Sequence, residues 1–168
     1  AQMQMGGSIM AKLLRLLEQD CTLTHEQLAS MTDMTVADVE AAIQRYEADK
    51  TILGYQAIVD WDRTDRERVE AMIEVRVTPQ RDQGFDAIAE RIYRFDEVKS
   101  VYLMSGAYDL LLLVEAHTLK ELAFFVSTKL STLETVTGTA THFVLKRYKS
   151  DGVIFEGNNQ DKRLVVTA

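Results

Sequence analysis

The 168-residue sequence predicts a two-domain α+β protein in which an N-terminal winged helix-turn-helix precedes a ferredoxin-like βαββαβ domain. Three observations support this fold class. Apolar residues recur at helical spacing up to about residue 49, between short polar motifs that begin helices. From Val69 the apolar period changes to two residues, as in a half-buried strand. Val98–Glu115 then reads as two strands joined by a glycine-containing turn.

Three helices are predicted for the first domain. Residues 1–8 have no periodicity, so we predict a disordered lead or a remnant of expression there. Ile9–Gln19 carries leucines at helical spacing. Thr24–Gln27 has the pattern of a capping box, and Thr35–Asp38 repeats the hydroxyl cap at a third helix. The short link between the second and third helices predicts a helix-turn-helix.

The third helix and a polar segment end this domain. Residues 52–59 are predicted to form a short strand or a linker that completes domain 9–59. The charge-dense segment 60–69 is predicted to be a hinge. The buried stripe of the third helix is predicted to comprise Val36, Val39, Ile43 and Tyr46.

The second domain, residues 70–150, is predicted to have the element order β-α-β-β-α-β. With right-handed crossovers, both helices cover one face of a four-stranded antiparallel sheet. The other face stays bare, which predicts self-association. Residues 151–168 form a tail in which Leu164–Val166 is a candidate edge strand. The predicted elements are a strand from Val69 to Pro79, a helix Gly84–Phe95, strands Val98–Met104 and Leu110–Glu115, a helix Leu119–Leu130 and a strand Thr135–Leu145.

Composition excludes several classes of protein. The net charge of −7 argues against a surface that is basic overall, although a local basic patch remains compatible with it. No apolar run is long enough for a membrane helix, and no secretion signal opens the chain. The single cysteine, Cys21, fits a reducing cytoplasm. Cys21 and His25 read as structural residues, and no phosphate loop, metal spacing or catalytic set is present, so we predict no enzyme and no cofactor.

The order of elements and three short motifs together resemble the Lrp/AsnC family of bacterial and archaeal transcription regulators, over about residues 9–150. The resemblance implies that the helical domain binds double-stranded DNA. It implies that the second domain forms dimers and often octamers, and binds amino acids or related effectors between dimers. The motifs are Ile52-Leu53-Gly54-Tyr55, Ser105-Gly106-Ala107-Tyr108-Asp109, and Leu133-Glu134-Thr135-Val136 leading to Thr139 and Thr141.

The resemblance also implies two sets of site residues. On the third helix, Arg45 would contact the DNA backbone, while the bases or phosphates would be approached by Thr35, Val36, Ala37 and Gln44. The effector would bind the loop of Ser105, Gly106, Ala107, Tyr108 and Asp109, with Thr139 and Thr141 adding hydroxyls. The simpler alternatives are that the loop is only a turn and that the two threonines only favour a strand.

The sequence departs from the family pattern in the charge of the helical domain. Residues 1–56 contain four lysines and arginines against eight acids, a local net charge of −4. Family members commonly carry arginine at the position matching Ala42, and this chain does not. Since neutralisation of phosphates supplies much of DNA affinity, a second function stays open. That alternative is an effector-binding assembly protein that has lost DNA binding and contacts a protein partner.

Overall fold

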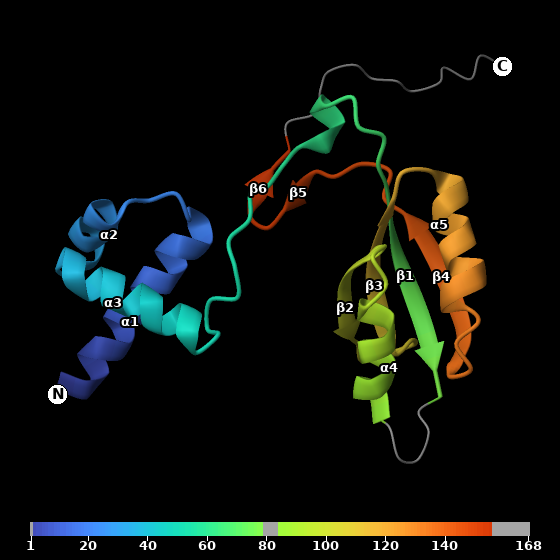
Figure 1. Cartoon of the computed structure of the whole chain (residues 1–168), viewed down its shortest axis with the longest axis horizontal. Coiled ribbons are helices and arrows are strands. Elements are labelled where there is room, and N and C mark those ends of the chain that lie inside the picture. Colours follow the sequence, from blue (N-terminus) through green and yellow to red (C-terminus); the bar gives the residue numbers. More distant parts are fainter. Residues whose placement is uncertain (1, 79–83, 156–168) are drawn as a thin grey trace. The chain divides into compact units, whose positions relative to one another are not determined.

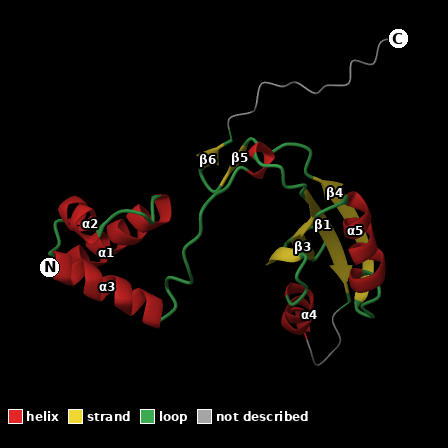
Figure 2. Ribbon diagram, turned by 45° about the horizontal axis from the view of Figure 1, so that its top comes forward, coloured by secondary structure: helices red, strands yellow, loops and turns green. Residues whose placement is uncertain are grey.

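The structure is a computed structural model that describes residues 2–78 and 84–155, with side chains from residue 9 onward. It divides into two compact units at the Val59–Asp60 boundary, and Asp151–Val153 belongs with the first unit (Figure 1). Figure 2 distinguishes the helices and strands of each unit by colour. No described helix is both long and apolar enough to cross a membrane.

The first unit is built from three helices, α1 (Gln2–Gln19), α2 (His25–Thr32) and α3 (Val36–Ala48). The predicted helix-turn-helix is therefore present. The predicted disordered lead is not, because α1 begins at Gln2 rather than Ile9. Glutamine and methionine are good helix formers, so the residues before Ile9 extend the helix despite two intervening glycines.

The buried face of α3 differs from the predicted stripe in two residues, because Val36 is absent from it and Ala42 is added. Val36 is 40% exposed, so its predicted burial was wrong. At 100° per residue Val36 lies only about 20° from the buried Ile43, so its exposure comes from its place in the first turn of α3 and not from its angle around the helix. The α3 residues that pack into the core with Leu13 and Leu28 are Val39, Ala42, Ile43 and Tyr46.

The segment after α3 is a linker in this chain. Ile52 packs against the helical core, and its N–H donates to the Tyr46 carbonyl at 2.9 Å. Residues 53–60 have no regular structure, so no wing strand is formed there. Of the two alternatives that the sequence left open for this segment, strand or linker, the structure has the linker.

The second unit contains a four-stranded antiparallel sheet with the order β2-β3-β1-β4. Its element order confirms the predicted βαββαβ arrangement. A short 3-10 helix, Trp61–Arg63, precedes the sheet, and a two-stranded hairpin of β5 (Lys149–Ser150) and β6 (Val153–Ile154) follows it. The main elements are β1 (Val69–Val77), α4 (Gly84–Tyr93), β2 (Val98–Leu103), β3 (Leu110–Ala116), α5 (Leu119–Phe125), the π-helical turn Val126–Leu130 and β4 (Val136–Phe143).

Both helices of this unit cover the same face of the sheet. Ile92 of α4 and Phe125 of α5 belong to one core cluster with Ile73 and Leu112 of the central strands. Tyr93, Leu119 and Ala123, which helical spacing would place on the inward stripes of the two helices, are exposed instead. In place of Leu119 and Ala123, Phe125 is buried, edge to face with Phe95 at 5.6 Å between ring centroids.

The opposite face of the sheet carries no helix, as predicted. On this open face Leu111 and Leu113 of β3 are half-buried, whereas Met72 and Tyr102 are 47% and 54% exposed. His142 and Glu74 form a pair there, with 3.3 Å between Nε2 and Oε1. Pro79 and the candidate edge strand Leu164–Val166 lie outside the described residues.

Candidate functional site

The turn of the helix-turn-helix is fixed by caps on both sides. Thr24 and Gln27 form the predicted capping box at the start of α2. Asp33 ends α2 in the left-handed conformation, at φ 57°. At the start of α3, the Thr35 hydroxyl accepts from the Asp38 N–H at 3.1 Å and donates to the Asp38 carboxylate at 2.7 Å. The local sequence therefore determines where α3 begins.

Three of the predicted DNA contacts share one exposed face of α3. Val36, Ala37 and Gln44 are all exposed, and Ala37 and Gln44 are seven residues, or about two turns, apart. Thr35 is exposed, but its hydroxyl is engaged by Asp38. Arg45 points elsewhere: its Nη2 donates to the Met10 sulfur at 2.9 Å, and its guanidinium lies 5.4 Å from the Tyr46 ring centroid.

The acidic residues of α3 differ in what they bind. The Asp38 carboxylate is bound to Thr35, and Glu47 accepts from the Tyr55 hydroxyl at 3.0 Å. Burial, followed by this bond to Glu47, raises the pKa of the Tyr55 hydroxyl. Glu40 is exposed and has no hydrogen-bond or ion-pair partner among the described residues. It lies between Val36 and Gln44 on the same face, which therefore carries an unpaired negative charge.

The position where the resemblance places a family arginine is not on this face. Ala42 is 5% exposed and packs into the helical core. A long charged side chain would not fit there without displacing the packing against α1 and α2. The exposed face of α3 is therefore acidic because Glu40 lies on it, while the Arg45 side chain is directed to Met10 and does not neutralise that charge.

The loop between β2 and β3 is anchored to the end of β1 by Asp109. The Asp109 carboxylate accepts from the Val77 N–H at 2.8 Å, and the Asp109 N–H donates to the Val75 carbonyl at 3.0 Å. The Met104 N–H donates to the Asp109 carbonyl at 2.8 Å, which closes the loop. Gly106 has φ 120°, a conformation that side chains disfavour. Asp109 therefore has at least the structural role that the simpler alternative gave it.

The remaining residues of the predicted effector site lie at the same end of the sheet. Ser105, Gly106 and Ala107 are exposed, and Tyr108 is half-buried. Thr139 pairs with Val75, as Leu110 does from the other side of β1. Because the loop and Thr139 are separated by β1, they lie about 10 Å apart across two strand spacings.

Thr141 is two residues farther from the loop, opposite Ile73 in the register. Thr139 and Thr141 are both half-buried and share the helix-covered face with their β1 partners. A cavity of about 200 Å³ lies on the open face beside the Thr139 backbone, and Glu74, Arg76, Gly138 and Ala140 line it. Asp109 and Thr141 do not converge within one copy of the chain.

At the other end of the sheet, Glu70 holds a network of charged side chains. Its two carboxylate oxygens accept separately from Arg68 and Arg147. Arg68 also pairs with Glu115 of β3 at 2.9 Å, and Arg66 pairs with Glu115 at 3.5 Å. We call this set of Arg66, Arg68, Glu70, Glu115 and Arg147 the hinge network. It joins the chain that enters the sheet to the chain that leaves it.

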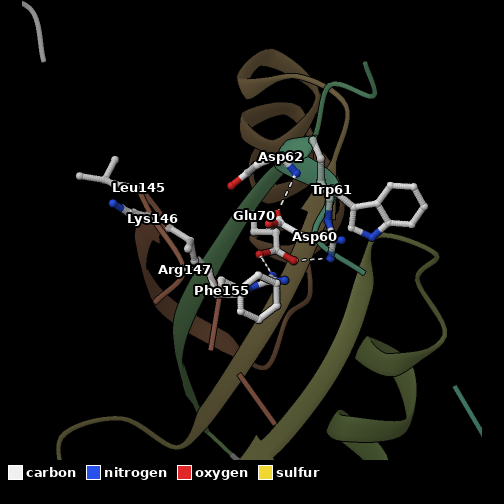
Figure 3. A pocket seen from close by; sticks show the side chains of 10 residues that line it. Asp60, Trp61, Asp62, Glu70, Leu145, Lys146, Arg147 and Phe155 are labelled. Atoms are coloured by element: carbon white, nitrogen blue, oxygen red, sulfur yellow. Dashed lines mark hydrogen bonds and ion pairs between the residues drawn. The ribbon is translucent and has the colours of Figure 1, made fainter. Parts of the chain in front are cut away.

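A cavity of about 150 Å³ lies beside the hinge network, and its lining side chains are drawn in Figure 3. The Trp61 ring lies 4.8 Å from the Arg66 guanidinium carbon, and the Phe155 ring lies 5.1 Å from that of Arg147. In Figure 3 Leu145 points away from the other lining side chains, in agreement with its 93% exposure.

Comparison with known proteins identifies the family. Residues 70–154 match the Lrp/AsnC ligand binding domain. Over 157 residues the chain is 48% identical to the uncharacterized HTH-type transcriptional regulator YugG of Bacillus subtilis strain 168, and the alignment covers 93% of this chain and 95% of YugG. The chain is a member of the Lrp/AsnC family. Its relatives are transcriptional regulators and not enzymes.

Two solved structures have the same fold. One is the transcriptional regulator NMB0573 of Neisseria meningitidis in complex with L-Met, with a TM-score of 0.69 and 21% identity, covering 84% of this chain and 91% of that chain. The other is Escherichia coli AsnC, with a TM-score of 0.67 and 17% identity, covering 85% of this chain and 94% of that chain. At sequence identities this low, the structural similarity supports the fold of this Lrp/AsnC chain and no further property.

Sequence reasoning missed the hinge network of this Lrp/AsnC protein. No sequence pattern marks Arg147 as a site residue, yet Arg147 is paired with Glu70 and only a quarter exposed, at 25%. The residues of the network are up to 77 positions apart, so no local pattern joins them. The available signals were the charge density of segment 60–69 and the solitary tryptophan within it.

Proposed function

We propose that this Lrp/AsnC protein is a cytoplasmic regulator of transcription. Its helical unit would bind double-stranded DNA, and its sheet unit would self-associate and bind an amino acid or a related small effector. The observation that carries this proposal is the 48% identity to an HTH-type transcriptional regulator along almost the whole of both chains.

The exposed face of α3 is the proposed reading surface for DNA. Gln44 can form a bidentate contact with adenine, and the Val36 methyl groups suit a thymine methyl group in the major groove. Ala37 is small, which allows the helix to approach the bases closely. Thr35 would act through the helix cap that it forms, since the amides at a helix N-terminus bind phosphate. Arg45 would reach the DNA backbone only after leaving Met10.

Self-association compensates for the low positive charge of a single helical unit. The open face of the sheet is the proposed dimer surface, because a second copy of the chain would remove its apolar side chains from water. These side chains are Met72, Tyr102, Leu111 and Leu113. A dimer presents two helix-turn-helix units to successive major grooves, and linking the units raises the effective concentration of the second.

The loop Ser105–Asp109 is the proposed effector site. Its exposed backbone around Gly106 offers amides to a carboxylate, and NMB0573 of Neisseria meningitidis, which has the same fold, was solved in complex with L-Met. Because Asp109 and Thr141 are apart within one copy, the site would be completed where two dimers meet. An effector bound there would favour one assembly and thereby change the spacing of the DNA-binding units.

DNA binding can be tested with the region upstream of the protein's own gene. Fluorescence anisotropy at 50 and 200 mM salt should give an affinity that falls steeply with salt, roughly as the number of phosphates contacted. Gln44→Ala should weaken binding to the specific site by about tenfold, in the range of one bidentate base contact. Gln19→Ala, on the exposed end of α1, is the matched control and should leave the affinity unchanged. Absence of binding at micromolar protein and 50 mM salt would contradict the proposal.

One observation favours the second candidate, an assembly protein without DNA binding. Glu40 places an unpaired negative charge on the α3 face, while the Arg45 side chain is directed to Met10. If the face binds DNA, Glu40→Gln should tighten binding at low salt, and Glu18→Gln on α1 should do so less. If neither the wild type nor Glu40→Gln binds DNA at 50 mM salt, the second candidate is favoured.

Self-association and effector binding share one measurement. Light scattering should give a dimer or a larger assembly, and one or more of the twenty amino acids should shift the mass or the thermal midpoint. A strictly monomeric particle at all concentrations would contradict the dimer surface. An unchanged mass and midpoint with all twenty would contradict the effector site.

A further inference from the structure

We propose that the cavity beside the hinge network is a second ligand site, which binds a small carboxylate. This cavity lies where the chain enters the sheet at Asp60, at the opposite end of β1 from the loop Ser105–Asp109. The two sites therefore share no residues, and either one can be present without the other. Three features of the hinge end support a ligand: its charge, an unpaired donor and its aromatic walls.

The first feature is an excess of positive charge. Arg63 and Asp60 pair with each other at 3.1 Å and cancel. The lining alone carries three charges of each sign, so an excess arises only because Arg63, which lies outside the lining, neutralises Asp60. With that pair set aside, the charged side chains of the cavity and the network carry one more positive than negative charge. The cations are Arg66, Arg68, Lys146 and Arg147, and the acids are Asp62, Glu70 and Glu115. One carboxylate would neutralise this excess.

The second feature is a buried donor. Arg68 lines the cavity, its side chain is 18% exposed, and its Nε is buried with no acceptor among the described residues. A buried N–H without an acceptor is destabilising, and a charged acceptor removes that penalty most effectively. Both oxygens of the neighbouring Glu70 are already engaged by Arg68 and Arg147. A ligand carboxylate would supply that acceptor once Arg68 turns its Nε toward the cavity.

The third feature is the shape of the cavity. Its 150 Å³ correspond to the liquid volume of roughly five waters, which is room for a small organic acid. Trp61, Phe155 and Val144 supply apolar surface beside the cations. A carboxylate next to guanidinium groups, with its carbon chain against aromatic rings, fits this lining better than an inorganic anion does.

Two kinds of carboxylate fit, and Asp62 distinguishes them. An α-amino acid would add an ammonium group that the Asp62 carboxylate could bind, whereas a 2-keto acid would offer only its carboxylate and a neutral oxygen. The shared chemistry is the carboxylate on a short apolar chain. A ligand in the cavity would contact both Trp61 and Phe155. Trp61 stands directly after the linker from the helical unit.

The fluorescence of Trp61 provides a direct test, because it is the only tryptophan of the chain. The full-length protein is titrated with the twenty amino acids, their 2-keto acids and, as an anion control, inorganic phosphate. A saturable change in emission with an amino acid or a keto acid, and none with phosphate, is the expected result. No saturable change with any of the organic acids would overturn the proposal, and so would an equal response to phosphate.

Variants locate the response. Arg147→Gln should weaken binding by about tenfold or more, as expected for losing a hydrogen bond to a charged group. Lys146→Glu reverses a charge at the exposed rim, leaves the buried network intact and should also weaken binding, which covers the case in which Arg147→Gln fails to fold. The double variant Thr139→Val with Thr141→Val, at the loop end, should respond as the wild type does. A response lost in this double variant but kept in Lys146→Glu would overturn the proposal.

Discussion

The two ends of the sheet hold their connecting segments by different chemistry. At the loop end, one carboxylate, that of Asp109, accepts from the backbone N–H of Val77. At the hinge end, Glu70 and Glu115 accept from three guanidinium groups. The loop end therefore depends on backbone geometry, while the hinge end depends on charged side chains that come from distant parts of the sequence.

This difference has a consequence for recognition. A ligand at the proposed loop site would meet amide groups whose positions are fixed by the strands, so its binding would depend on shape and hydrogen bonds. A ligand at the hinge end would meet charges, whose attraction salt weakens.

Removing the centre of the hinge network should have the largest effect. Glu70→Ala leaves Arg68 and Arg147 as neighbouring like charges that are mostly buried, which should lower the free energy of unfolding by about 3 kcal/mol. Urea denaturation measures the change. Glu90→Ala breaks the exposed pair with Arg94 and should cost about 0.5 kcal/mol or less. Equal losses in the two variants would show that the network is not a stabilising centre.

At the loop end, the carboxylate of Asp109 should matter somewhat less. Asp109→Ala removes the acceptor of the Val77 N–H and should lower the free energy of unfolding by about 2 kcal/mol. Asp109→Asn keeps an acceptor oxygen and should lose less than half of that. If the asparagine variant is as unstable as the alanine variant, the negative charge rather than the acceptor geometry holds the loop.

The backbone of the loop should contribute a smaller amount. Gly106 has φ 120° with no heavy atom within 4 Å of an added Cβ, so Gly106→Ala should cost about 1 kcal/mol through backbone strain alone. Gly138 in β4 also has open space but no positive φ. Gly138→Ala should therefore leave the thermal midpoint unchanged or raise it. A similar loss in both variants would argue against strain as the cause.

The smallest effect concerns pH at the hinge end, where the Glu115 N–H donates to the Glu97 carbonyl at 2.8 Å. Burial raises the pKa of the Glu97 carboxyl, but its hydrogen bond from Lys129, a backbone bond and the charge of Lys129 together lower that pKa below 4.5. A lowered pKa adds stability above the unfolded value near 4.5, and this stability disappears as the pH falls through the folded pKa.

Lys129→Met should therefore cost about 0.5 kcal/mol at pH 7, since the lysine is partly exposed, and nearly nothing once Glu97 is protonated in the folded protein. Urea denaturation at pH 7 and pH 3 measures this difference. Lys120→Met, on the exposed side of α5, is the control and should show no such pH dependence. A cost that is independent of pH would assign the effect to packing of the lysine stem.

Local patterns predicted the elements of this fold well. The capping motif at Thr24, the alternation through β1 and the apolar run of β3 depend on neighbouring residues, and the structure has all three. The pattern failed at the end of α5, where Phe125 rather than Ala123 is buried. Phe125 and Leu130 are five residues apart, and the π-helical turn places them on one side of the helix.

The candidate sites were harder to predict because they depend on register and side-chain direction. The sequence suggested Asp109 as a ligand-binding group, but its bond to Val77 exists only because β1 and β3 pair in one register. Likewise, nothing local indicates that Arg45 turns to Met10 or that Arg147 reaches Glu70. Separations of 32 to 77 residues carry no periodic signal, so tertiary contacts alone determine these roles.

The central position of β1 has a consequence for how the protein is made. The three helices are complete once the ribosome has passed residue 59, whereas β1 receives its last partner, β4, only at residue 143. At ordinary elongation rates those 84 residues take roughly 4 to 17 seconds. From residue 116, where β3 ends, to residue 143 the nascent chain carries a finished helix-turn-helix ahead of a sheet in which one edge of β1 still lacks its partner. Unpaired strand edges promote aggregation, so we expect chaperones to matter most at that stage.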